Sequence, residues 1–107
     1  MNWTPLTDMN QLDAIDLASQ QQPQIIFKHS TRCNISADAY DEMEHADTEA
    51  YYLDLLRYRD ISDEIAQRYG VIHKSPQVLI ISNGVCIFNE SHWRIKASVL
   101  QAQLQNP

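Results

Sequence analysis

Apolar residues follow two kinds of spacing along this chain of 107 residues. In some stretches they recur every three or four positions, which predicts amphipathic helices with one face on a core. In others they gather in short runs, which predicts strands over 25–28, 50–56, 78–81 and 85–88. The helical positions are Met9, Leu12, Ile15 and Ala18; Ile35, Ala39 and Met43; Ile61, Ile65, Ala66 and Tyr69; and Val99, Leu100 and Leu104.

Local signals mark the ends of two of these helices. We expect Thr7 or Asp8 to cap the first helix and Asp60 or Ser62 to cap the third. Short oxygen-bearing side chains accept hydrogen bonds from the free N–H groups of a first turn. Gly70 ends the third helix, because glycine readily adopts the left-handed conformation that follows a last helical turn.

The order of these elements predicts the fold class. Asn83-Gly84 stands between the last two strands, which is typical of a tight antiparallel hairpin. The earlier strands are separated by helices and are therefore expected to pair in parallel. We predict one α/β domain over 1–107, a four-stranded mixed sheet with helices on both faces.

Charge and cysteine content narrow the possible partners and surroundings. The formal net charge is −6 and the pI is about 4.9, whereas binding to nucleic acids or anionic membranes depends on clustered Lys and Arg. We expect neither partner, and we find no signal-peptide pattern or membrane-spanning run. Two cysteines fit neither a metal-binding spacing nor a secreted disulfide framework, which favours a cytoplasmic location.

Cys33 is the residue with the clearest chemical potential. It follows a strand and begins a helix, where free N–H groups and the positive end of the helix dipole favour a thiolate. Such surroundings bring a cysteine pKa from about 8.5 down to roughly 3.5–7.5. Arg32 adds a positive charge beside it. Ser36 occupies the position that a second cysteine takes in a C-x-x-C pair, so one sulfur must carry out the chemistry alone.

The element order and several short motifs resemble the thioredoxin fold. Tyr69-Gly70-Val71, Ser75-Pro76 and the Asn83-Gly84 turn stand at places that match those of thioredoxins. The resemblance implies that Pro76 is cis and faces Cys33. Thioredoxins carry a buried acid six residues before the nucleophile, whereas this chain has Phe27 there and no resolving thiol for such an acid to deprotonate.

A narrower resemblance covers nearly the whole chain. Phe27-Lys28-His29-Ser30-Thr31, the Cys33-Asn34-Ile35-Ser36 box and Ser91-His92-Trp93 are similar to those of the YtxJ-like monothiol bacilliredoxins, redox-active proteins of the bacillithiol system. One departure is Asn34, where the family usually has proline. Asparagine restores a backbone N–H beside the sulfur.

This second resemblance implies a monothiol thiol-disulfide oxidoreductase that removes bacillithiol from protein mixed disulfides. It implies bacillithiol as co-substrate without a bound cofactor, bacillithiolated proteins as partners, and another redoxin as one source of reductant. Cys33 and Ser36 would be catalytic. The substrate-binding positions would be Thr31, Arg32, Asn34, Ser75, Pro76, His92 and Trp93.

Several alternatives stay open at this point. Ser36 either donates its hydroxyl to the thiolate or is only a first-turn residue, and Trp93 either lines the thiol pocket or packs on the core. Lys28 and Arg32 are the nearest cations for an anionic thiol. Cys86 is expected to be a core residue, too distant from Cys33 to form a disulfide.

Two other functions also stay open. One is a glutaredoxin-like protein that uses another small thiol or a bridged iron–sulfur cluster. The other is a non-catalytic binding or sensor module. The histidines at 29, 45, 73 and 92 show no metal-ligand spacing, so we expect no metal site.

Overall fold

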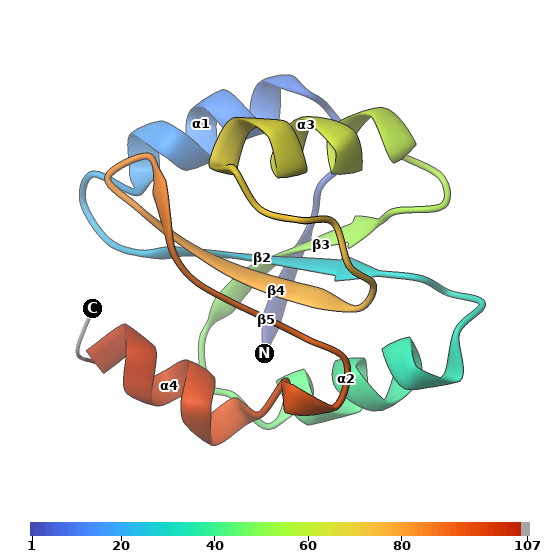
Figure 1. Cartoon of the computed structure of the whole chain (residues 1–107). Coiled ribbons are helices and arrows are strands. Elements are labelled where there is room, and N and C mark those ends of the chain that lie inside the picture. Colours follow the sequence, from blue (N-terminus) through green and yellow to red (C-terminus); the bar gives the residue numbers. More distant parts are fainter. Residues whose placement is uncertain (106–107) are drawn as a thin grey trace.

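The computed structural model describes residues 1–105 as a five-stranded sheet between two pairs of helices (Figure 1). The strands lie in the order β1-β3-β2-β4-β5. The α/β class and the helices on both faces agree with the prediction, whereas the predicted number of four strands was wrong. The elements are β1 (Asn2–Pro5), α1 (Asn10–Ala18), β2 (Gln24–His29), α2 (Asn34–Glu44), β3 (Glu49–Asp54), α3 (Arg59–Tyr69), β4 (Gln77–Ser82), β5 (Val85–Ser91), the short 3-10 helix η1 (His92–Arg94) and α4 (Ala97–Gln105).

The unpredicted strand is β1, at one edge of the sheet. It pairs in parallel with β3, with Trp3 opposite Ala50. Its four residues are mostly exposed and show no alternation of apolar and polar positions, so only the pairing with β3 defines it as a strand. The Trp3 ring stacks on Tyr40 of α2 and meets the Tyr52 ring edge to face, which anchors this edge to the core.

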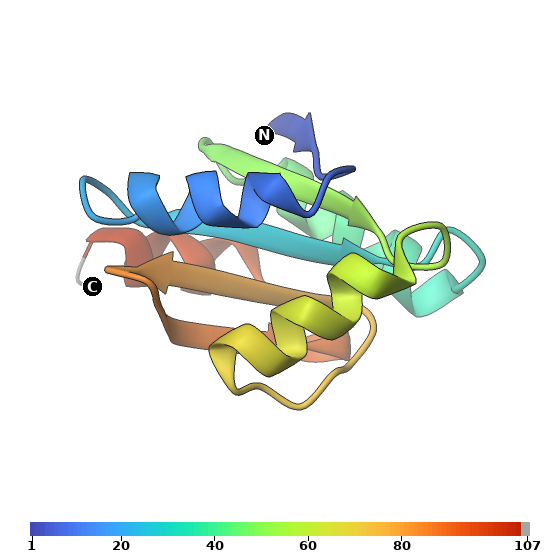
Figure 2. The same cartoon turned by 90° about the horizontal axis from the view of Figure 1, so that it is seen from above.

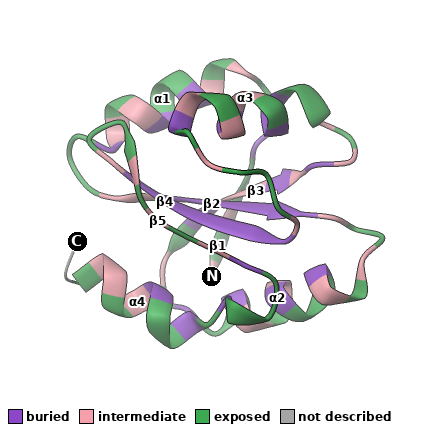
Figure 3. Ribbon diagram, viewed as in Figure 1, coloured by how far each residue is buried: buried purple, intermediate pink, exposed green. Residues whose placement is uncertain are grey.

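The remaining pairings match the predicted topology. β2 and β3 are parallel, and β4 is antiparallel to both β2 and β5. β2 and β4 are buried on both faces of the sheet (Figure 3). In the hairpin turn Asn83 and Gly84 have φ of 51° and 75°, so both adopt the positive φ that a tight two-residue turn requires. The predicted hairpin is confirmed.

Two hydrophobic cores fill the space between the sheet and the helices. One lies under α1 and α3, which cross the same face of the sheet (Figure 2). The other lies under α2 and α4. Alternate residues of β2 serve the two cores, with Ile26 in the first and Ile25 and Phe27 in the second. The next residues, Lys28 and His29, therefore point to opposite faces, which places them in different surroundings.

The start of α1 differs by one or two residues from the prediction. Met9 is the N-cap, so neither Thr7 nor Asp8 holds that position. The Asp8 carboxylate still accepts a hydrogen bond from the N–H of Asn10 at 2.8 Å, one residue before the cap position.

The start of α3 was also predicted wrongly. Its N-cap is Tyr58, and Asp60 and Ser62 lie within the first turns. A backbone turn explains this, because the N–H groups of Arg57 and Tyr58 both donate to the carbonyl of Asp54 and lead the chain directly into the helix. At the other end Gly70 has φ of 64°, and the predicted stop is confirmed.

Candidate functional site

Cys33 is the N-cap residue of α2, immediately after the loop that leaves β2. Its backbone is extended, with φ of −117° and ψ of 126°, which is usual for an N-cap. The residue is half-buried and forms no disulfide. The structure therefore has a reachable thiol at the start of a helix, as the sequence predicts.

The backbone of the first turn of α2 offers free donors near this sulfur. The N–H groups of Asn34, Ile35 and Ser36 have no acceptor within residues 1–105. The first amide to be bonded is that of Ala37, which donates to the carbonyl of Cys33 at 3.1 Å. Free N–H groups together with the positive end of a helix dipole stabilise an anion at this point. Asn34 itself is exposed.

Ser36 is fully buried, and its hydroxyl has two partners. It accepts a hydrogen bond from the N–H of Ser30 at 2.9 Å, and it lies 3.1 Å from Nδ1 of His29. Burial lowers the pKa of His29, which favours the neutral ring. The tautomer of that ring sets which of the two groups donates in this hydrogen bond. A bond from Ser36 to Cys33 is not among the hydrogen bonds of the described residues.

His29 also contacts the site, although in the sequence it stood out only within a family motif and no metal was expected there. It is the last residue of β2 and stands opposite Asp54 of β3. Its ring lies 5.4 Å from the Tyr52 ring and 5.5 Å from the Tyr40 ring, between centroids. Burial lowers its pKa, and the nearby Asp54 carboxylate opposes that effect. His29 lies two residues after Phe27 in β2, so the alternation of a strand places both side chains on the face that α2 covers.

Ser75 and Pro76 directly precede β4 and lie beside the C-terminal end of β2, because the two strands are antiparallel. Gln77, the next residue, stands opposite Lys28, and the Ser75–Pro76 peptide bond is cis, as the resemblance implies. Pro76 is buried, and the Ser75 hydroxyl oxygen is buried without a hydrogen-bond partner.

His92 and Trp93 continue this side of the site. The N–H of His92 donates to the carbonyl of Pro76 at 3.2 Å, which joins the end of β5 to the cis-proline. Trp93 is 63% exposed, so it does not pack on the core. Both residues line a hollow together with Lys74, Glu90, Ser91 and Arg94.

Thr31 and Arg32 line a second hollow, on the β3 side of the site. The other residues of its wall are Asp54, Leu56, Arg57 and Arg59, which come from the end of β3, the following turn and the start of α3. Thr31 and Arg32 immediately precede Cys33, so this hollow adjoins the thiol along the chain. Sequence reasoning missed Arg57 and Arg59, because only the fold brings them beside Arg32.

Lys28 occupies a different place from the one expected of a cation that helps an anionic thiol. Its side chain is completely buried, and Nζ has no hydrogen-bond partner. It lies on the same face as Ile26, under α3, where Asp63 is the nearby opposite charge. Burial lowers its pKa to about 8. The expectation for Lys28 was therefore wrong, because the alternation of β2 turns it away from the Cys33 side.

Cys86 lies near the N-terminal end of β2, whereas Cys33 follows its C-terminal end. It stands opposite Ile81, which in turn stands opposite Gln24 at the start of β2. The two ends of β2 are about 16 Å apart, at about 3.3 Å per residue, so at least this distance separates the surroundings of the two cysteines. The thiol donates to the carbonyl of Phe88 at 3.2 Å, and burial raises its pKa. Cys86 is half-buried and packs against the first core rather than lying within it. The predicted separation from Cys33 is confirmed.

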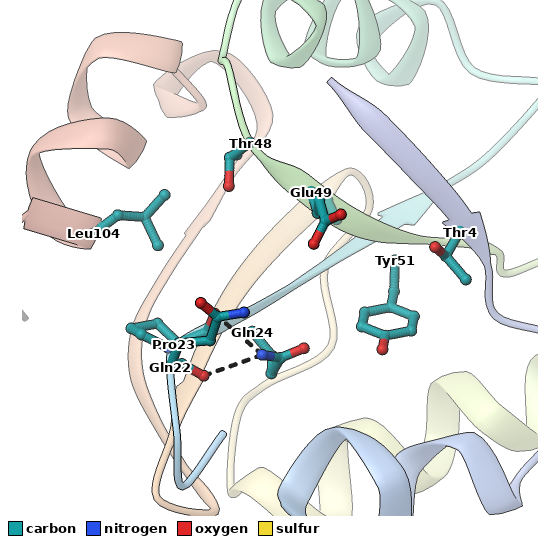
Figure 4. A pocket seen from close by; sticks show the side chains of 9 residues that line it. Thr4, Gln22, Pro23, Gln24, Thr48, Glu49, Tyr51 and Leu104 are labelled. Atoms are coloured by element: carbon teal, nitrogen blue, oxygen red, sulfur yellow. Dashed lines mark hydrogen bonds between the residues drawn. The ribbon is translucent and has the colours of Figure 1, made fainter. Parts of the chain in front are cut away.

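A further pocket lies near the N-terminal ends of β2 and β3, remote from Cys33 (Figure 4). Its wall includes Gln22 and Gln24 at the start of β2, Thr48 and Glu49 at the start of β3, and Leu104 of α4. It offers neither a nucleophile nor a cation. This pocket is therefore separate from the site around Cys33.

No helix within residues 1–105 has the length and apolar character needed to cross a bilayer. The same range contains no group of three or more His, Cys, Asp or Glu side chains arranged to hold a metal ion.

Comparison with known proteins finds a matching family and several similar solved structures. A family model described as Monothiol bacilliredoxin BrxC matches residues 4–100. A solved thioredoxin-fold protein described as a candidate oxidoreductase has 33% identity and a TM-score of 0.84, over 97% of this chain and 94% of its own.

Two thioredoxins are more distant. That of Malassezia sympodialis has 20% identity and a TM-score of 0.70, over 98% of this chain and 89% of its own. Thioredoxin f of spinach chloroplast has 14% identity and a TM-score of 0.70, over 97% and 84%. These likenesses confirm the predicted thioredoxin-like fold class.

Proposed function

The chain belongs to the monothiol bacilliredoxin family, and from this premise we propose that it removes bacillithiol from mixed disulfides with protein cysteines. The family and the fold support a thiol-disulfide oxidoreductase. The observation that carries single-sulfur exchange is a half-buried Cys33 at the start of α2, with Cys86 near the opposite end of the strands. The family supports bacillithiol as the small thiol.

The first step is an exchange between sulfurs. The Cys33 thiolate attacks the bacillithiol sulfur of the modified protein, and the S–S bond to the protein breaks as a new S–S bond to Cys33 forms. The protein cysteine leaves as a thiolate and takes a proton from water. One disulfide replaces another, so no external oxidant or reductant is needed in this step.

The second step returns Cys33 to its starting state. A second thiolate, from bacillithiol or from another redoxin, attacks the bacillithiol sulfur on Cys33 and releases the Cys33 thiolate. Bacillithiol is thus a co-substrate, and no bound metal or organic cofactor takes part. We place this cycle in a reducing cytoplasm, where small thiols are abundant.

Each of the other site residues has a role that its position supports. The free N–H groups at Asn34, Ile35 and Ser36 stabilise negative charge on the sulfur. Ser36 holds the first turn of α2 against Ser30 and His29.

The substrate lies beside Cys33, between the cis-proline and the two hollows. The Ser75 backbone faces an extended substrate, and Pro76 forms the rim of the site. Thr31 and Arg32 contact the substrate on the β3 side, and His92 and Trp93 contact it on the β5 side.

The test is an incubation with a bacillithiolated protein, followed by intact-mass measurement of both proteins. We expect the substrate to lose the mass of bacillithiol and Cys33 to gain it. The Cys33→Ser variant should do neither. The Cys86→Ser variant is the matched control and should behave as the unaltered protein, because Cys86 is remote from the site.

The two other functions predict different outcomes of the same experiment. Transfer from a glutathionylated substrate at an equal or higher rate would favour a glutaredoxin-like protein with another small thiol. Iron and colour after anaerobic purification would favour a bridged cluster. Absence of any transfer, with Cys33 alkylated at the pH dependence of free cysteine, would refute the proposal and favour a binding or sensor module.

A further inference from the structure

We propose that the hollow beside Thr31 and Arg32 binds the carboxylates of the small-thiol part of the substrate, with Arg32, Arg57 and Arg59 as its cationic wall. This inference rests on the proposed function and deepens it, because it names the chemical class of thiol that the site accepts. The ligand is a low-molecular-weight thiol with carboxylates several bonds from its sulfur. Arg57 and Arg59 are the residues that it adds to the site.

The fold brings these arginines together from distant parts of the sequence. The N–H of Leu55 donates to the carbonyl of His29 at 3.1 Å, so the turn after β3 is bonded to the end of β2. Both Arg57 and Tyr58 then donate through their N–H groups to the carbonyl of Asp54. This turn places Arg57 and Arg59 in one wall with Arg32, the residue before the nucleophile.

The charges in this wall are unbalanced. Within residues 1–105 all side-chain ion pairs belong to Arg68, which binds Asp13, Asp16 and Glu64. Arg32, Arg57 and Arg59 thus have no carboxylate partner there, although the whole chain carries a net charge of −6. Unpaired guanidinium groups concentrated in a hollow attract and orient small anions.

The position of Arg59 gives a second reason. It is the first residue of α3, where the positive end of the helix dipole disfavours a cation. Its neighbour Arg57 lies with its guanidinium 5.5 Å from the centroid of the Tyr58 ring, a contact that orients the side chain without neutralising it. Both arginines are exposed, so neither is needed to fill a core.

The hollow also has a suitable size and a net positive wall. Its volume is about 360 Å³, within the range of small-molecule sites. Within residues 1–105, Asp54 is the one carboxylate of this wall, and its Oδ1 atom is buried. Three guanidinium groups thus outnumber one carboxylate, which suits a ligand that carries carboxylates of its own.

The experiment compares exchange rates for two mixed disulfides of one peptide, with bacillithiol and with cysteamine. Bacillithiol carries carboxylates, and cysteamine carries only an amine. We expect Arg57→Gln and Arg59→Gln each to lower kcat/KM for the bacillithiol disulfide about tenfold, as loss of a charged hydrogen bond does. The rate with the cysteamine disulfide should stay unchanged or rise. Lys96→Gln is the matched control, because it removes one exposed positive charge outside the hollow.

Binding provides an independent readout. In the Cys33→Ser variant, oxidised bacillithiol should shift the side-chain Nε–H resonances of Arg57 and Arg59 in an NMR titration, and high salt should weaken this binding. Equal losses with both disulfides, or equal loss in Lys96→Gln, would overturn the proposal. So would unchanged rates in both arginine variants or an absence of shifts. Failure of the proposed function is distinct, because the unaltered protein would then not transfer bacillithiol, whereas failure of the present proposal leaves that transfer intact.

Discussion

Replacing Lys28 by Met should stabilise this protein. The Lys28 side chain is completely buried in β2, and its ammonium group has no hydrogen-bond partner. Asp63 is the nearby opposite charge, and it does not form an ion pair with Lys28. Methionine has a similar length and no charge, so it fills the same space without the cost of keeping an ammonium out of water.

The lowered pKa gives the size of that cost. Burial lowers the pKa of Lys28 from 10.5 to about 8, and each pKa unit corresponds to about 1.4 kcal/mol. At neutral pH the ammonium is still charged, so the folded state carries a penalty of about 3 kcal/mol. We expect Lys28→Met to recover on the order of 2–3 kcal/mol of the free energy of unfolding.

The sign of the pH dependence follows from the same shift. Between pH 8 and 10.5 the folded protein has released the Lys28 proton while the unfolded chain still holds it. The unfolded state then binds more protons, so stability rises with pH across this window. The Lys28→Met variant should lack this rise, because it has no group that titrates at this position.

Urea denaturation of both proteins at pH 7, 8, 9 and 10 measures these effects. Lys96→Met is the matched control, because Lys96 is exposed and its loss should change stability by less than about 0.5 kcal/mol. Thiol-exchange activity of Lys28→Met should equal that of the unaltered protein, since Lys28 points away from Cys33. A destabilised variant, or an unchanged slope between pH 8 and 10, would refute the reasoning.

Three further predictions follow from buried polar groups. Ser36→Ala removes the hydrogen-bond partner of the Ser30 N–H and of His29, so it should lower the free energy of unfolding by about 1–3 kcal/mol. Urea denaturation measures this loss, with Ser98→Ala at an exposed position as the control. Burial lowers the pKa of His29 below 6.5, so the unfolded chain binds more protons below pH 6.5 and stability should fall there. His29→Asn should reduce this loss between pH 7.5 and 5.5. Tyr69→Phe removes a hydroxyl that donates to Asp16 at 2.6 Å, and should lower the Tm by at least about 4 °C in a thermal scan.

Features with a local cause could be predicted from the sequence. The Asn83-Gly84 turn and the Gly70 stop depend on backbone conformations that few other residues adopt, so their identity alone locates them. The start of α2 at Cys33 was equally predictable, because a buried strand and an amphipathic helix adjoin there. These signals were sufficient to position Cys33.

Features that depend on distant contacts could not be predicted. β1 shows no strand pattern and exists through its pairing with β3, some 47 residues further along, as in the pair Asn2 and Glu49. The helix start at Tyr58 depends on the preceding turn rather than on a capping side chain. The approach of Arg57 to Arg32 likewise requires the bond between Leu55 and His29.

The surroundings of Ser36 argue that more than one residue adapts this chain to single-sulfur exchange. The Ser30 N–H and His29 Nδ1 lie 2.9 Å and 3.1 Å from the Ser36 hydroxyl, distances that suit oxygen and are short for sulfur. Phe27, on the same face, leaves no acid there to deprotonate a second thiol. Cys86 lies near the opposite end of the strands. Under the proposed function we therefore expect a mixed disulfide on Cys33 to persist until a thiol from another molecule reaches it, and turnover should rise with the concentration of that thiol.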